Sequence, residues 1–169
     1  MNLPTKFLII KSKFPIFATN NLKQNKVAEK RRKELYDYPV KILLAVIEAI
    51  GGNVKIHRWL TKGGYPELSA LVSTLQADEE AFNWLMQNGY NHYAAFCNAI
   101  DDDPKAIEWL VKHKFQFLIL MVDAVEEKEN AIAWLTNNKF HIFIIMAKKI
   151  LKMKQDQLIG YADYHKIHF

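Results

Sequence analysis

Few side chains in this chain have the types and spacing that catalysis or metal binding requires. The densest cluster is Asp101–Asp103, and neighbouring carboxylates can hold a cation or exchange a proton with a substrate. The cluster directly precedes Pro104, however, and aspartate before proline is a typical start of a helix. Another acidic turn follows at Glu126 and Glu127. We therefore expect these carboxylates to cap helices and face solvent.

Histidine and cysteine offer no complete site either. His165 and His168 form a pair near the C-terminus with no third ligand nearby, so we expect no metal. Cys97 is the only cysteine, and it follows Phe96 in an apolar segment, which predicts a buried thiol in a reducing cytoplasm. The chain lacks His-Glu-x-x-His, Gly-x-Ser-x-Gly and a phosphate-binding glycine loop. These absences favour a protein without catalytic residues or cofactors.

The elements that carry these side chains follow a fixed period. Each tryptophan precedes a leucine, and neighbouring pairs are 25 residues apart: Trp59-Leu60, Trp84-Leu85, Trp109-Leu110 and Trp134-Leu135. Other apolar columns keep the same step, and the position six residues after each tryptophan is Tyr65, Tyr90, Phe115 and Phe140. The register extends over residues 28–152. Such self-similarity is typical of a repeat protein.

Each 25-residue unit predicts two short helices. Asp103-Pro104 opens one first helix, and the second helices are expected at 65–75, 90–100, 115–125 and 140–150, where apolar residues recur at helical spacing. The turn between the two helices contains Gly64, Gly89, Lys114 or Lys139. Glycine suits the left-handed conformation that follows many helices, and lysine suits it less. We therefore expect a different geometry in the two later turns.

These helix pairs predict the fold class. A short helix pair cannot bury its own apolar face, so the pairs must stack on one another. We expect an all-α, right-handed α-solenoid of about five antiparallel helix pairs, with the Trp-Leu column and the second helices in its core. Residues 1–27 are expected to form an N-terminal arm and residues 153–169 a C-terminal capping segment. Within that segment, the aromatic residues that would cover the end of the stack are Tyr161, Tyr164 and Phe169.

The helical units carry a resemblance of low specificity. The stretch Asp103–Lys112 resembles a helix of an ankyrin repeat, although 25 residues leave no room for the ankyrin hairpin and the Thr-Pro-Leu-His opening is absent. HEAT-like and tetratricopeptide units are longer. About three quarters of the chain is thus similar to α-solenoids in general. That resemblance implies a scaffold that binds other molecules.

Composition limits the setting in which the protein works. The 169 residues are half hydrophobic, enough for one domain with a substantial core. The apolar run Phe7–Ile10 is broken by Lys11 and Lys13, so it does not predict a signal peptide. No apolar run reaches the roughly 20 residues that span a membrane. We expect a cytoplasmic protein without membrane contact.

Charge is distributed unevenly around a net value of +5. Residues 1–41 carry +7, residues 42–65 carry +2, residues 66–136 carry −8 and residues 137–169 carry +4. Fields of both signs can steer partners or promote head-to-tail pairing. The basic stretch 26–36 predicts a helix whose lysines and arginines face solvent, bind phosphate or dock a partner.

Candidate binding residues are those that vary within the repeat. The position before each tryptophan contains Arg58, Asn83, Glu108 and Ala133, of which the first three are the candidates. A second column lies two residues after each ring of the aromatic column. Glu67 and His92 indicate that this column faces solvent, so Phe117 and Ile142 are anomalous there. With Leu120 and Ile145 one turn later, they would form an apolar stripe. Residues 153–169 could cover this stripe; a homodimer, a partner protein or a membrane are the alternatives.

We therefore expect a non-enzymatic protein-interaction module of the scaffold or adaptor type, acting on another protein or on itself. The alternative is a nucleic-acid-binding protein that resembles HEAT-like DNA glycosylases. In that case a basic set would share one concave face, namely Arg31, Arg32, Lys33, Lys41, Lys55 and Arg58.

Overall fold

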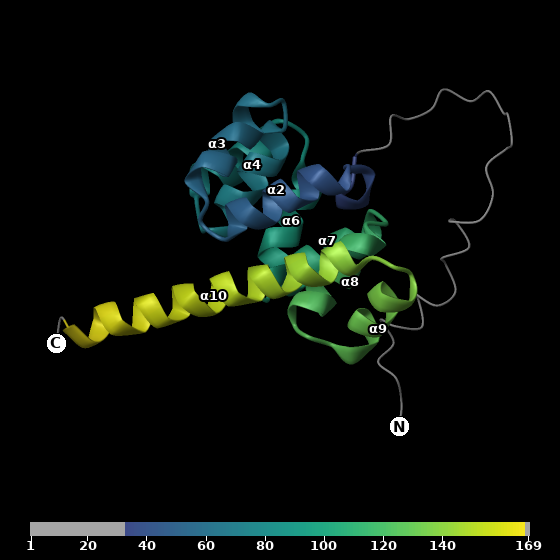
Figure 1. The fold of residues 1–169 in the computed structure, drawn as a ribbon. Coiled ribbons are helices and arrows are strands. Elements are labelled where there is room, and N and C mark those ends of the chain that lie inside the picture. The colour runs from purple at the N-terminus through teal and green to yellow at the C-terminus, as the bar shows by residue number, and fades with distance from the viewer. Residues whose placement is uncertain (1–32, 168–169) are drawn as a thin grey trace, which may run out of the picture. The chain divides into compact units, whose positions relative to one another are not determined.

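The computed structural model describes the backbone of residues 33–167 and the side chains of residues 33–160. The chain divides into two units, Met1–Lys33 and Glu34–Phe169. Within the described residues the second unit is entirely helical, with nine α-helices, one 3-10 turn and no strand (Figure 1). The predicted all-α fold class is therefore confirmed.

The helices follow one another as pairs. The 3-10 turn η1 (Leu35–Asp37) leads into α2 (Val40–Ile50), which has no preceding α-helix in the described part of the chain. The pairs are α3 (Val54–Lys62) with α4 (Pro66–Leu75), α5 (Glu79–Gln87) with α6 (Asn91–Ile100), α7 (Pro104–Lys112) with α8 (Gln116–Val125), and α9 (Glu129–Asn137) with α10 (His141–Ile167). We call α3, α5, α7 and α9 the outer helices, and α2, α4, α6, α8 and α10 the inner helices.

The first expected pair is incomplete. The stretch 26–36 was predicted to be helical, but Glu34 is extended, with φ −98° and ψ 169°, and Leu35–Asp37 form only a 3-10 turn. Residues 26–32 lie outside the described part of the chain. The described residues therefore contain four helix pairs and a lone inner helix, rather than about five pairs.

Side-chain caps explain where the outer helices begin. Asn53 Oδ1 accepts a hydrogen bond from the Ile56 N–H at 3.2 Å, and Asp78 and Asp103 accept equivalent bonds at 3.1 and 2.9 Å. These bonds satisfy N–H groups that have no partner inside the helix. The prediction that Asp103 caps a helix is confirmed.

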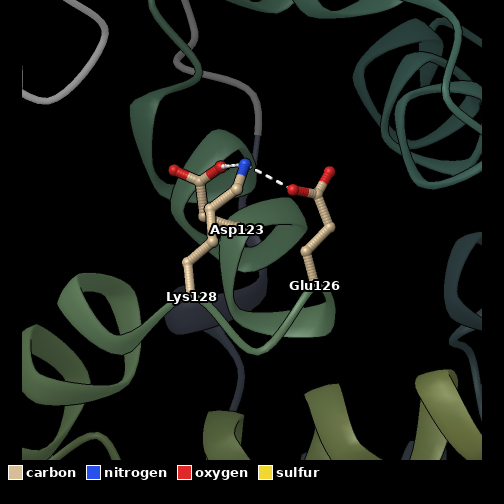
Figure 2. A network of polar contacts seen from close by, with 3 residues as sticks. All are labelled: Asp123, Glu126 and Lys128. Carbon is tan, nitrogen blue, oxygen red and sulfur yellow. Dashed lines mark hydrogen bonds and ion pairs between the residues drawn. The ribbon is translucent and has the colours of Figure 1, made fainter. Parts of the chain in front are cut away.

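The fourth outer helix begins differently, because lysine replaces the capping side chain. The Lys128 ammonium donates to Asp123 Oδ1 at 2.7 Å and also pairs with Glu126 (Figure 2). Partial burial lowers the pKa of Lys128, but the hydrogen bonds that it donates to Asp123 and Glu126 outweigh that effect and leave the pKa above its ordinary value. The lysine thus ties the end of α8 to the start of α9.

The turns between outer and inner helices share one geometry. Gly64 and Gly89 have φ of 87° and 80°, and Lys114 and Lys139 have φ of 64° and 63°. The expectation of a different geometry at the lysines is therefore wrong. The same backbone bond closes every turn; for example, the Phe115 N–H donates to the Leu110 carbonyl at 3.0 Å. This bond holds lysine in the left-handed region despite its Cβ.

The leucines of the Trp-Leu column lie in the core, while the tryptophans lie at its edge. The fully buried leucines are Leu60, Leu85, Leu110 and Leu135. By contrast, Trp59 is 44% exposed, and the other tryptophans are half-buried. Each tryptophan stacks on the aromatic ring six residues later; Trp84 and Tyr90 have centroids 5.8 Å apart and an interplanar angle of 9°. The tryptophans therefore pack across the turn, which corrects the expectation that they form the core.

The inner helices close into a ring. Each inner helix contacts the next along the chain, from α2 to α10, and α10 also contacts α2. Near the start of α2, the Tyr36 ring packs on Phe117, which packs on Phe143 of α10. At the end of α2, the Lys149 side chain lies against Gly51. An open stack would keep its first and last helices apart, so this contact distinguishes the fold from an open solenoid.

Helix α10 continues without a break past residue 152, where the capping segment was expected to start (Figure 1). Lys154 Nζ pairs with Asp101 Oδ1 at 2.7 Å, and Gln157 Nε2 donates to the Leu75 carbonyl at 3.4 Å. These contacts place α10 across the C-terminal ends of α6 and α4. The described part of 153–169 thus extends the last helix instead of folding back over it. The side chains of Tyr161, Tyr164 and Phe169 lie outside the described residues.

Candidate interaction surface

Two positions on the outer helices give the molecule a varied surface. The position before each tryptophan is exposed in all four outer helices, and so is the position three residues later, about one helical turn away. We call these eight residues the outer band: Arg58, Asn83, Glu108, Ala133, Thr61, Met86, Val111 and Thr136. The three polar residues predicted to bind a partner therefore all lie on this surface.

The outer band combines apolar and charged side chains. Met86 and Val111 are 44% and 42% exposed on α5 and α7, one turn from Asn83 and Glu108 respectively. Arg58 lies on α3, so the sign of the charge changes along the band. Protein interfaces commonly have an apolar centre that includes methionine and a polar rim that includes arginine. The band has this composition.

A cavity of about 410 Å³ lies between the α8–α9 turn, α9 and α10. Its lining combines two carboxylates, one ammonium and small apolar side chains: Ala124, Glu127, Glu129, Ile132, Ala133 and Lys148. Since Ala133 also belongs to the outer band, the cavity extends the band at its C-terminal end. A side chain of a partner bound there would meet charges of both signs.

The predicted apolar stripe does not form a surface. Phe117 and Leu120 are buried, Ile142 is half-buried, and only Ile145 is exposed. The Phe117 ring has centroid distances of 5.0 Å to Tyr36 and 4.8 Å to Phe143. Ring closure brings these groups onto α8, so the prediction of a binding role for Phe117 and Leu120 is wrong.

The column that was expected to face solvent is a core column instead. Glu67 and His92 are both buried, as are Ile42 and Phe117 at the equivalent positions. The polar residues are thus the exceptions in this column, not Phe117 and Ile142. The repeat register alone does not reveal this, because the groups that bury them come from other parts of the chain.

Tyr38, Glu67 and His92 are buried side chains that carry polar groups. The Tyr38 hydroxyl donates to Glu67 Oε1 at 2.6 Å, and the His92 ring stacks on Phe115 with centroids 4.9 Å apart. Burial raises the pKa of Tyr38, as do the neighbouring Tyr93 and the bond to Glu67; burial also raises the pKa of Tyr93. Both hydroxyls therefore stay protonated near neutral pH. This suits a hydrogen-bonding role, not a nucleophilic one.

The remaining chemical candidates have structural roles. Burial raises the pKa of the Cys97 thiol, which keeps it protonated and unreactive. Asp101 pairs with Lys154, Asp102 adopts a left-handed turn with φ 63°, and Asp103 caps α7. In the described part of the chain, no three histidine, cysteine or carboxylate side chains gather as metal ligands. No described helix is both long and apolar enough to cross a membrane.

The basic candidates within the described residues are exposed. Lys33, Lys41, Lys55 and Arg58 are all exposed, whereas Arg31 and Arg32 lie outside the described residues. Residues 33–160 carry 14 basic and 16 acidic residues, so the helical body has a formal charge of −2. The positive excess lies in residues 1–32, with eight basic residues and one acidic residue.

Comparison with known proteins identifies no family. No protein-family model matches the chain, and neither curated proteins nor solved structures yield a match.

Proposed function

We propose that this protein is a non-enzymatic scaffold or adaptor that binds a partner protein through the outer band. One observation carries the proposal: both band positions are exposed in all four outer helices, yet their chemistry differs from unit to unit. A right-handed stack with a 25-residue unit is part of the same proposal. The starts of the outer helices support the unit length, since Val54, Glu79, Pro104 and Glu129 are each 25 residues apart.

The composition of the band favours a folded protein as partner. Met86 and Val111 would supply the apolar centre, where binding energy usually concentrates. Arg58 favours an acidic group at one end of the interface, and Glu108 favours a basic group nearer the other. A specific interface of ordinary size needs about 800 Å² from each partner, more than one helix face offers. Several outer helices would therefore contribute together.

The experiment compares partner capture by the native chain with capture by Met86→Asp/Val111→Asp. Both side chains are exposed, so the double variant should keep its circular dichroism spectrum. We expect at least a tenfold loss of affinity, which corresponds to about 1.4 kcal/mol. The control is Val54→Asp, an equally exposed apolar residue outside the band. Equal affinity of all three chains for every captured protein would refute the role of the band, and turnover of a substrate would refute a non-enzymatic function.

The second candidate function is nucleic-acid binding, including a DNA-glycosylase-like activity. It is favoured by the strongly basic residues 1–32, together with the exposed Lys33, Lys41 and Lys55. The test is DNA binding at several salt concentrations, because each phosphate contact contributes about −0.9 to the slope of log K against log salt. A steep slope that becomes shallower in Lys41→Gln/Lys55→Gln would support this candidate over the first.

A further inference from the structure

Among residues 33–167, one junction of the inner ring has no outer helix. Every outer helix contacts the inner helix before it and the inner helix after it, so α3 bridges α2 and α4, and α9 bridges α8 and α10. In the described part of the chain no helix bridges α10 and α2, although these two helices are in contact. The chain enters α2 through extended Glu34 and the turn η1 instead. We call this junction, which no helix of residues 33–167 covers, the α2–α10 gap.

Side chains at the gap are exposed where their repeat equivalents are buried. Leu44 on α2 is 48% exposed, but Ser69 at the equivalent position of α4 is buried. Helix α3 covers Ser69, since Thr61 Oγ1 lies 2.7 Å from its hydroxyl and His57 Nε2 lies 3.0 Å from its carbonyl oxygen. On α10, Ile145 is 53% exposed, whereas its equivalents are fully buried at Leu120 and half-buried at Ala45, Ala70 and Ala95. The gap therefore presents the apolar surface that an outer helix would cover.

The same chain also has a helix end with little cover. Lys154 and Gln157 direct one side of α10 toward α6 and α4. Ile159 is 60% exposed and lies about 140° around the helix from Lys154, at about 100° per residue. Ile145, Lys152, Asp156 and Ile159 are all exposed and face away from the α6 and α4 contacts. Within residues 33–167, the α2–α10 gap is thus not covered by a helix, and the exposed side of α10 is not covered by another element.

The exposed stripe of α10 is self-complementary in charge and spacing. From its N-terminal end it consists of Ile145, Lys148, Lys152, Asp156 and Ile159, so the steps are 3, 4, 4 and 3 residues. Two such stripes that run antiparallel about Lys152 would place isoleucine opposite isoleucine and lysine opposite aspartate at both ends. The two Lys152 side chains at the centre are long enough for their ammonium groups to diverge into solvent.

We propose that a second copy of this chain fills the α2–α10 gap, in a homodimer built on antiparallel α10 helices. Ile159 of the partner subunit lies opposite Ile145, and Asp156 of the partner subunit pairs with Lys148. The end of the partner's α10 then runs along the gap toward Leu44. Its direction is that of an outer helix, because outer and inner helices are antiparallel within each pair. Residues 159–167 also number nine, the length of each outer helix.

Sedimentation of the full-length chain tests the dimer. The native chain is expected at about 39 kDa, twice its 19.7 kDa. Ile159→Glu should shift it to the monomer with an unchanged circular dichroism spectrum, because this side chain is exposed. The matched control is Val54→Glu on α3, which should remain dimeric. A native chain that stays monomeric at every concentration, or a dimer that tolerates Ile159→Glu, would overturn the proposal.

A charge exchange tests the antiparallel register. Lys148→Asp and Asp156→Lys should each weaken the dimer about tenfold through like-charge contacts, and the two changes in one chain should restore it. Mixing Ile145→Cys chains with Ile159→Cys chains should also give a disulfide-linked heterodimer. These positions are about 21 Å apart within one helix, so the bond cannot form inside a chain. Failure of both the charge rescue and the cross-link contradicts the proposed register.

The dimer does not depend on the outer band, so the two proposals fail separately. Met86→Asp/Val111→Asp should leave the dimer intact, and Ile159→Glu should leave partner capture intact. If the native chain is monomeric and Leu44→Glu abolishes capture of another protein, the gap belongs to that protein and the homodimer is refuted.

Discussion

Every turn of the repeat contains one residue with a left-handed backbone conformation. Each turn between successive helices places one residue in the left-handed region, with φ between 56° and 89°. Three of these residues are glycines, and the others are Ala77, Asp102, Lys114, Glu127 and Lys139. A side chain with a Cβ costs roughly 1 kcal/mol in this conformation. The turn is therefore imposed by the packing of the two helices it joins, even where the local residue opposes it.

We predict that Lys114→Gly and Lys139→Gly each stabilise the protein. Relief of the left-handed conformation should outweigh the added freedom of glycine in the unfolded chain, for a net gain of about 0.5–1 kcal/mol. Urea unfolding of each variant measures this gain. Lys112→Gly removes the same charge within α7 and should destabilise the fold. A loss of stability in Lys114→Gly similar to that of the control would contradict the prediction.

At the scale of elements, buried polar contacts join segments that the repeat does not relate. Tyr38 precedes α2 and lies outside the aromatic column, yet its hydroxyl bonds Glu67 in the first turn of α4. A carboxyl group in a helical first turn also interacts favourably with the positive helix end. The contact holds the entry to α2 against α4.

We predict that Tyr38→Phe destabilises the protein by about 2 kcal/mol, because the buried Glu67 carboxyl group loses a hydrogen-bond donor. Glu67→Met should remove much of that penalty. The variant Tyr38→Phe/Glu67→Met should therefore lose less unfolding free energy than the sum of the losses in the two single variants. A double-mutant cycle by urea unfolding measures the coupling. Additive effects within error would show that the hydroxyl and the carboxyl group do not stabilise each other.

At the scale of the whole helical body, the contact between α2 and α10 makes the stability of the first inner helix depend on that of the last. In an open stack each unit contacts only its neighbours, so an end unit can unfold alone. Here the first and last inner helices pack on each other, and Leu43 and Phe143 are both buried within the inner ring. Loss of either helix would uncover the core of the other.

We therefore predict one cooperative unfolding transition, even in variants destabilised at one end. Leu43→Ala in α2 and Leu118→Ala in α8 should each cost about 2–5 kcal/mol, because both side chains are buried. Circular dichroism and tryptophan fluorescence should give coincident urea transitions in both variants. A separate early transition in Leu43→Ala alone would show that the ring does not couple its ends.

Sequence alone was sufficient for the features that depend on neighbouring residues. The helix pairs, the cap at Asp103 and the leucine column follow from the 25-residue register, because each is decided within a few turns of the chain. Arg58 and Asn83 are exposed for the same reason: they lie on the polar side of short amphipathic helices. The turns at Lys114 and Lys139 mark the limit of local reasoning, since packing overrides the preference of the residue.

Tertiary structure alone decided which positions of the inner helices meet solvent. Burial of Glu67, Phe117 and Leu120, and exposure of Leu44, depend on groups far away in the sequence. Tyr38 and Glu67 are 29 residues apart, and α2 and α10 come from opposite ends of the repeat. Equivalent positions in a repeat have equal local preferences but unequal neighbours once the ring closes. The same period that predicts the helices therefore cannot predict which of their faces remains uncovered.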